Sequence, residues 1–130
     1  MTFNDLQATL GALAVTGVDR KYTHPPEVIN PADMPMLFPR LPSGTNGLLS
    51  VTLDGRLHIN MEMVILVRYS GLDLATNRFD QAVDLMDNLN TALVTESEAN
   101  LGIDRWDIRY AVEFAGGEQV TAIIATIEAS

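Results

Sequence analysis

The pattern that most constrains the fold is a strand signal near the middle of the chain, in residues 57–70, which read LHINMEMVILVRYS. Every second residue of this stretch is apolar: Leu57, Ile59, Met61, Met63, Ile65, Val67 and Tyr69. The residues between them are polar at both ends and apolar in the middle: His58, Asn60, Glu62, Val64, Leu66, Arg68 and Ser70. Because successive side chains of a strand point to opposite faces of a sheet, this alternation predicts a long central strand. We expect one face of the strand to be apolar along its whole length, and the other to be covered at its centre and exposed to solvent at its ends.

The composition fits one folded domain with an acidic surface. The chain has 130 residues, 47% of them hydrophobic, which is enough for a single core over residues 1–130. Its net charge of −9 argues against a surface that binds nucleic acid or an anionic membrane, since both need clustered lysine and arginine. An acidic surface does suit a channel through which DNA passes without sticking. There is no cysteine, so disulfides and thiol chemistry are excluded.

The sequence gives no sign of a targeting or membrane segment. The first basic residue is Arg20, so the start of the chain does not read as a signal peptide. The longest purely aliphatic run, residues 63–67, is far too short to span a bilayer. We therefore expect a soluble protein that is made and used inside a cell, or in a particle assembled there.

Two segments have the apolar spacing of amphipathic helices. In residues 3–16, apolar side chains recur at intervals of three and four: Phe3, Leu6, Leu10 and Leu13. Thr2 and Asp5 form a predicted capping box at its start, and Gly17 is its predicted end. In residues 75–95, six apolar side chains share one arc of the helix: Phe79, Ala82, Val83, Met86, Leu89 and Leu93. Asp73 or Thr76 is the predicted N-cap of this second helix, and a polar turn at residues 96–100 ends it.

All six prolines lie in an irregular segment, residues 18–47, whose core is the Pro-rich stretch 23–47. Proline has no backbone donor, so neither a long helix nor a central strand fits this segment. We expect only a short strand in residues 18–22 and a short edge strand in residues 36–38.

Two hairpins complete the predicted fold. Residues 48–53 form a strand that turns at Asp54-Gly55 into the long strand. A three-residue loop, which places Leu53 opposite Leu57, keeps apolar side chains on one face and is preferred to a two-residue turn. In the last hairpin, a turn at Gly116-Gly117 pairs residues 106–114 with residues 119–127: Phe114 with Gln119, Val112 with Thr121, Tyr110 with Ile123, Ile108 with Ala125 and Trp106 with Ile127.

The order of these elements predicts an α+β fold. We expect a mostly antiparallel sheet of about four to six strands, with two helices packed on one face.

Catalytic motifs are absent from the sequence. There is no nucleophile elbow and no phosphate-binding loop, and basic residues are few and scattered. His58, Asn60 and Glu62 share one strand face, which is compatible with a metal or acid–base site but is more simply a polar strand end. We therefore expect no enzymatic activity, no metal and no cofactor.

The remaining polar and flexible side chains are better explained by contact with a partner than by catalysis. Candidate interface residues lie in the Pro-rich segment and on the partly polar face of the long strand: Met34, Met36, Arg40, Arg56, His58, Asn60, Glu62 and Arg68. Three aspartates form a line along the second helix: Asp80, Asp84 and Asp87. This line is either a solvated helix face or a surface that faces a lumen or a basic neighbour.

Several features together resemble the tail terminator, or tail-completion, proteins of long-tailed bacteriophages. The amphipathic helix at residues 3–13 leads to VDRKY at 18–22, HPPE at 24–27 and ADMPMLFP at 32–39, and then to the hairpin, the long helix and the final hairpin. The resemblance implies a domain that forms a homo-hexameric ring in the virion, assembled in the cytoplasm of the host bacterium. Such a ring caps the head-proximal end of the tail tube, stops polymerisation of the tube protein and joins the tail to the neck. Its partners are the tail tube protein and a neck or head-completion protein, and DNA passes through without specific binding.

Three other functions fit the same residues. One is another head–tail connector or neck protein, which uses a similar ring. The second is a ferredoxin-like module that binds a small molecule in an apolar pocket with convergent polar groups. The third is an enzyme with a perturbed titratable pair at His58 and Glu62.

Overall fold

The computed structural model describes residues 1–42, 49–51, 57–68, 77–100 and 102–130. The elements follow one another as α1 (Phe3–Gly11), β1 (Arg20–Lys21), a 3-10 turn η1 (Pro31–Asp33), β2 (Met36–Arg40), β3 (Leu49–Val51), β4 (Leu57–Val67), α2 (Asn77–Ala99), β5 (Ile103–Ala115) and β6 (Glu118–Ala129).

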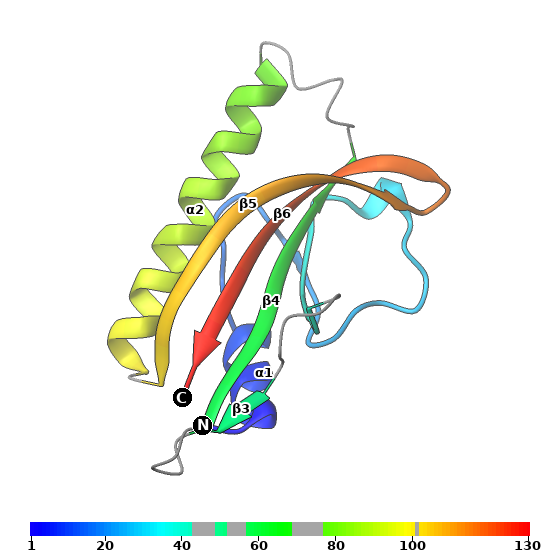
Figure 1. Cartoon of the computed structure of the whole chain (residues 1–130). Helices are drawn as coiled ribbons and strands as arrows, with labels where there is room; N and C mark the ends of the chain where they lie inside the picture. The colour runs from blue at the N-terminus through cyan, green and yellow to red at the C-terminus, as the bar shows by residue number, and fades with distance from the viewer. Residues whose placement is uncertain (43–48, 52–56, 69–76, 101) are drawn as a thin grey trace.

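The strands form one six-stranded sheet in the order β1-β2-β4-β6-β5, and β3 also pairs with β4. All pairs are antiparallel except β1 with β2. Both helices contribute to one hydrophobic cluster on the same face of the sheet, and Figure 1 shows α2 running alongside β5. The predicted α+β fold, with two helices on one face of the sheet, is confirmed.

The long central strand has the two faces that its sequence predicts. Its fully apolar face packs under the helices, where Ile59, Met63 and Ile65 are buried. On the other face Val64 and Leu66 are buried in a separate, smaller cluster, which we call the second core. The second core draws on four strands and the Pro-rich segment: Met36, Phe38, Val64, Leu66, Val120, Ala122 and Ile124, with Tyr22, Ile29, Met34, Ala111 and Ala115 packed against them.

The β5–β6 hairpin bends over the second core, and its turn rests on the Pro-rich segment (Figure 1). The turn residue Gly116 has a φ of +61°, and a Cβ atom there would lie 2.6 Å from Cδ of Pro31 and 2.7 Å from the carbonyl oxygen of Ile29. Only glycine fits this turn, because both the conformation and the space exclude a side chain. The register matches the prediction, since Phe114 lies opposite Gln119 and Trp106 opposite Ile127.

The register predicted for the first hairpin is wrong. Leu49 lies opposite Ile59 and Val51 opposite Leu57, so that residues 52–56 connect the strands, and these connecting residues lie outside the described part of the chain. The shift from the prediction is two residues. A shift of two preserves the face of every side chain, so the apolar pattern cannot distinguish the two registers.

The first helix is shorter than predicted. The capping box between Thr2 and Asp5 is confirmed, but the helix ends at Gly11. Beyond it Leu13 and Val15 are buried while Ala12, Ala14 and Thr16 are exposed, which is the alternation of extended chain. The apolar residue at 13 therefore belongs to the core without belonging to the helix.

The second helix differs from the prediction at its end and in its buried face. It continues to Ala99, through the predicted polar turn, and its predicted N-caps Asp73 and Thr76 lie outside the described residues. The fully buried side of the helix includes Leu85, which the predicted arc omitted, whereas Phe79 and Val83 are exposed. The predicted apolar arc was therefore rotated around the helix axis too far toward the side that faces β5.

The strand predicted at an edge is internal. β2 pairs with β4 along its whole length and with β1 at Met36 and Leu37. Beyond Leu37 its outer side has no strand partner among the described residues, which is where Pro39 is tolerated.

A buried threonine offers a test of the core. Thr121 on β6 is fully buried, and its hydroxyl has no hydrogen-bond partner in the described part of the chain. A buried hydroxyl without a partner costs about 1–3 kcal/mol. We expect Thr121→Val to raise the free energy of unfolding in urea by about 1 kcal/mol, because valine removes the hydroxyl and keeps a similar shape.

The control is Thr126→Val, at a half-buried position on the same strand, for which we expect a change below about 0.5 kcal/mol. Destabilisation by Thr121→Val would mean that the hydroxyl has a partner in solution.

Candidate functional site

Arg40, at the end of β2, binds carboxylates from two other strands, and we call this group the ion network. Its Nε donates to Oε1 of Glu62 at 2.9 Å, and its terminal nitrogens donate to both carboxylate oxygens of Glu113 at 2.9 and 2.7 Å. Arg109 Nη2 also donates to Glu62, at 3.3 Å. Because β4 and β6 separate β2 from β5 in the sheet, the contact between Arg40 and Glu113 requires the hairpin to bend.

Because Glu62 is buried, we expect the ion network to be important for the stability of the fold. The Glu62 side chain is only 5% exposed, so its charge needs the guanidinium partners that it has. The two-point contact between Arg40 and Glu113 is the strong, directional form of an ion pair. Hydrogen bonding to Arg40 lowers the pKa of Glu113, although burial opposes the shift. The bonds to Glu113, and then to Glu62, raise the pKa of Arg40.

The other predicted interface residues are distributed differently. Met36 is buried in the second core, and Met34 is half-buried against it. His58 and Asn60 are half-buried, and Arg68 is exposed, with its Nε 3.4 Å from Oε1 of Glu118. Arg56 lies outside the described residues.

The trio of His58, Asn60 and Glu62 does not come together as a metal site. No group of three acidic, histidine or cysteine residues is placed to hold a metal among the residues that the structure describes. Both carboxylate oxygens of Glu62 accept hydrogen bonds from arginine instead.

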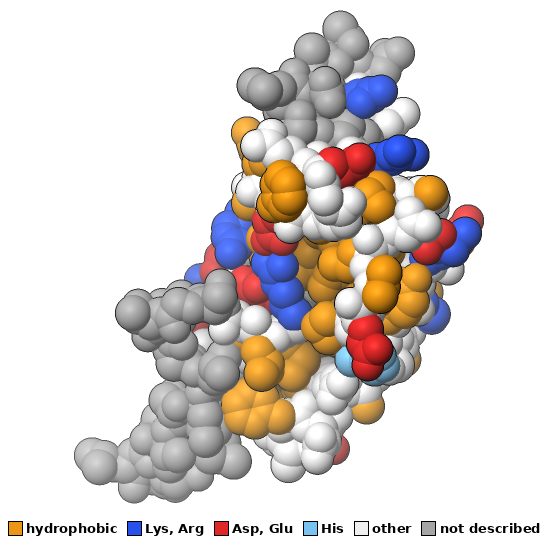
Figure 2. Space-filling view, turned by 90° about the vertical axis from the view of Figure 1, so that its right-hand side faces the viewer, with side chains coloured by type: hydrophobic (Ala, Val, Ile, Leu, Met, Phe, Trp, Pro, Cys, Tyr) orange, Lys and Arg blue, Asp and Glu red, His pale blue; other side chains and the backbone are white. Residues whose placement is uncertain are grey.

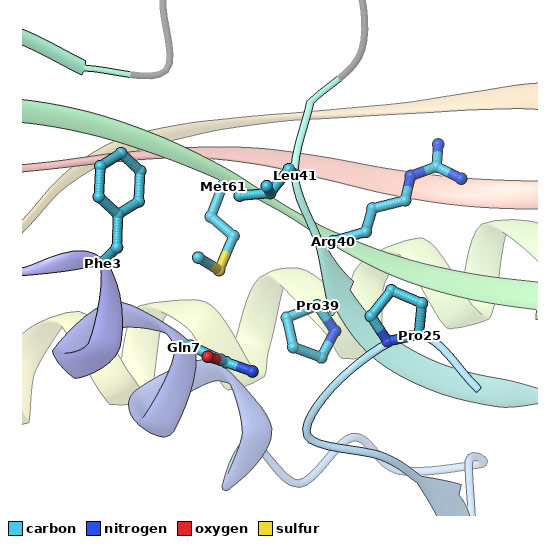
Figure 3. Close-up of a pocket in the computed structure, with 7 residues that line it drawn as sticks. All are labelled: Phe3, Gln7, Pro25, Pro39, Arg40, Leu41 and Met61. Atoms are coloured by element: carbon cyan, nitrogen blue, oxygen red, sulfur yellow. The ribbon is translucent and has the colours of Figure 1, made fainter. Parts of the chain in front are cut away.

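An apolar pocket of about 690 Å³, which we call the edge pocket, opens between α1 and the end of β2. It is lined by Phe3, Gln7, Pro25, Pro39, Arg40, Leu41 and Met61. Figure 3 shows the Met61 side chain between Phe3 and the rings of Pro39 and Pro25, while the guanidinium of Arg40 points away. Figure 2 shows one face of the molecule, on which hydrophobic side chains are spread over the centre and the lower part, with basic and acidic side chains among and above them.

The two polar side chains in the described lining of the edge pocket are already engaged. Gln7 Nε2 donates to the carbonyl oxygen of Thr23 at 2.7 Å, and Arg40 is bound to Glu62 and Glu113. The described lining of the pocket is therefore mainly apolar, with Leu41 exposed beside it.

The outer side of the bent hairpin carries three exposed apolar side chains, which we call the ridge. Tyr110 is 57% exposed, Val112 48% and Phe114 76%. The residues that alternate with them face inward: Ala111 and Ala115 pack on the second core, and Glu113 binds Arg40. The ridge thus lies on the convex side of the bend, on the last strand of the sheet.

The second helix adds apolar surface on the side toward this strand. Asn90 accepts a hydrogen bond from Trp106 Nε1 of β5 at 2.8 Å, which fixes the flank of α2 that faces β5. Phe79 lies three turns earlier on that flank and is 52% exposed, and Val83 follows it. The outward face of the same helix carries the predicted acidic line, and all of its members are exposed: Asp80, Asp84 and Asp87.

Sequence reasoning missed the edge pocket, the ridge and two members of the ion network, Arg109 and Glu113. The ridge residues continue the apolar alternation of β5, so the sequence pattern did not distinguish them from the buried residues of the same strand face. Their predicted partners gave a signal, since Phe114 and Val112 lie opposite the polar residues Gln119 and Thr121.

Comparison of the sequence with protein-family models and with curated proteins finds no match. In the described part of the chain, no helix is long and apolar enough to cross a membrane.

The ion network predicts a specific dependence of stability on pH. Arg40 makes the pKa of Glu113 lower in the folded protein than in the unfolded chain. Ionised Glu113 therefore stabilises the fold above the ordinary glutamate pKa of about 4.3, and this contribution is lost as the pH falls through the lowered pKa. We expect Glu113→Gln to reduce the free energy of unfolding at neutral pH and to flatten its decline below about pH 4.3.

Urea unfolding of the wild type and the variant across this pH range measures the difference. Glu98→Gln, at an exposed position on α2, is the matched control, and we expect it to change the free energy of unfolding at neutral pH by less than about 0.5 kcal/mol. Parallel profiles for the wild type and Glu113→Gln would contradict a role of the Arg40–Glu113 contact in stability.

Proposed function

We propose that this chain is a non-enzymatic structural protein of a phage virion, which forms a ring on the head-proximal end of the tail tube. In this role it stops polymerisation of the tube protein and joins the tail to the neck. The family resemblance supplies the role, and the observation that carries it is the ridge on β5, the last strand of the sheet.

The ridge supports an assembly role because its apolar residues lie on an edge strand. An edge strand with exposed apolar side chains is a template for association, and monomeric proteins usually protect such strands with charge or cover. The first half of β5 carries exposed charged residues, Arg105, Asp107 and Arg109, whereas its second half carries the ridge. A protein that functions within a ring has a use for such a surface.

The acidic character of the chain supports passage of DNA through the ring. The net charge is −9, and Asp80, Asp84 and Asp87 are exposed along the outward face of α2. None of the three forms an ion pair with a described residue. In our proposal this acidic line faces the lumen, where it repels the phosphate backbone.

A small-molecule-binding module is the second candidate, and the volume of the edge pocket favours it. A ligand site also needs polar groups that orient the ligand. Gln7 and Arg40, the polar side chains of the lining, are bound to other parts of the protein. The pocket is therefore better suited to apolar side chains of another protein.

The proposed function predicts a ring in solution and arrest of tube growth. We expect light scattering and native mass spectrometry to show a closed oligomer of six copies, alone or after addition of tail tube protein. Added to polymerising tube protein, the chain should shorten the tubes in proportion to its concentration.

Two results would contradict this proposal. A protein that stays monomeric or dimeric with tube protein present, and leaves tube length unchanged, excludes the terminator role. A ring that binds neck protein and ignores tube protein instead assigns the chain to another connector.

A further inference from the structure

We infer that copies of this chain associate head to tail, with the ridge of one copy seated in the edge pocket of the next. This inference rests on the proposed function for its partner, because a ring of more than two copies needs two different surfaces on each subunit. It goes further by naming both surfaces.

The two surfaces are complementary in shape and polarity. The ridge is convex and apolar, and Phe114 is its most exposed member. The edge pocket is concave and apolar, and its volume of about 690 Å³ accommodates several side chains. Leu41, at the mouth of the pocket, is itself 58% exposed and gains burial when the pocket is filled. Burial of an aromatic anchor in a pocket is the usual source of binding energy in a protein interface.

Their positions in the fold are those that a head-to-tail contact requires. The ridge and the pocket are separate surfaces of each copy, because the ridge side chains point away from the second core, whereas Glu113 between them points inward and binds Arg40 in the lining of the pocket. Joining β5 of one copy to the β2 side of the next therefore leaves a free ridge at one end and a free pocket at the other. Each added copy repeats the arrangement until the ring closes.

A symmetric contact between two β5 strands is the competing arrangement, and it stops at two copies. It would bury the ridge but leave the edge pocket empty. The structure favours the head-to-tail contact because it fills both apolar surfaces with a single interface. At the pocket side Pro39 has no N–H, so the contact there depends on side-chain packing rather than on a continuous sheet.

Single charged substitutions on exposed residues test the two surfaces separately. We expect Phe114→Glu and Leu41→Glu each to abolish the ring, and to raise the concentration needed for half-assembly by about 30-fold or more. Val94→Glu places the same charge on an exposed apolar residue in the second half of α2, and should assemble like the wild type. Circular dichroism and thermal unfolding verify that all three variants fold.

A mixture of the two defective variants distinguishes the head-to-tail contact from the symmetric one. In an equimolar mixture, the intact ridge of Leu41→Glu can occupy the intact pocket of Phe114→Glu, but neither product can be extended. Native mass spectrometry should therefore show a heterodimer and no ring. In the symmetric arrangement, Leu41→Glu alone would assemble as the wild type does.

If the wild type forms a ring and either variant still forms it, this interface is overturned and the proposed function stands. A wild type that forms no oligomer, with or without tube protein, overturns both.

Discussion

The contact on which the rest of the structure depends is that of Arg40 with Glu62 and Glu113. It joins β2 to β5 across two intervening strands, which is possible only when the β5–β6 hairpin bends over the face of the sheet opposite the helices. The bend closes the second core, and the fit of Gly116 against Pro31 and Ile29 anchors the turn. Charge pairing, apolar packing and glycine geometry thus specify the same curvature of the hairpin. When different interactions favour the same structure, the sequence has a single native state.

The bend of the hairpin also determines which side chains of β5 are exposed on the surface. Alternation along β5 means that turning Ala111, Glu113 and Ala115 inward turns Tyr110, Val112 and Phe114 outward. A flat sheet would leave these residues on the face that the helices cover. In our proposal the same curvature that completes the monomer therefore creates the convex surface by which one copy contacts another. In our proposal that contact builds the ring, and the family resemblance supplies its place on the tail tube.

Much of the fold follows from sequence, and the part that does not has identifiable reasons. Alternation in β4 and the glycine pair at 116–117 predicted the central strand and the register of the last hairpin correctly. The register of β3 was wrong because a shift of two residues keeps every side chain on its face. Leu13 was assigned to the first helix because it is apolar and falls at helical spacing. It is apolar because it is buried in the core, although the chain is extended there.

Less of the candidate site could be predicted from the sequence. Arg40 and Glu62 were singled out, but Glu113 lies 73 residues from Arg40, and only the bend brings them together.

The most direct test of the account is covalent trapping of the contact between copies. The chain has no cysteine, so the variant Gln119→Cys/Pro25→Cys carries one reactive thiol beside the ridge, opposite Phe114, and one at the pocket, and it leaves Phe114 and Leu41 in place. Treated with a short bismaleimide at assembling concentration, it should give a ladder of joined chains that ends at a closed ring, while each single-cysteine variant remains unjoined. Efficient dimer formation by Gln119→Cys alone, with no ladder from the double variant, would show that two ridges meet each other and would contradict the head-to-tail account.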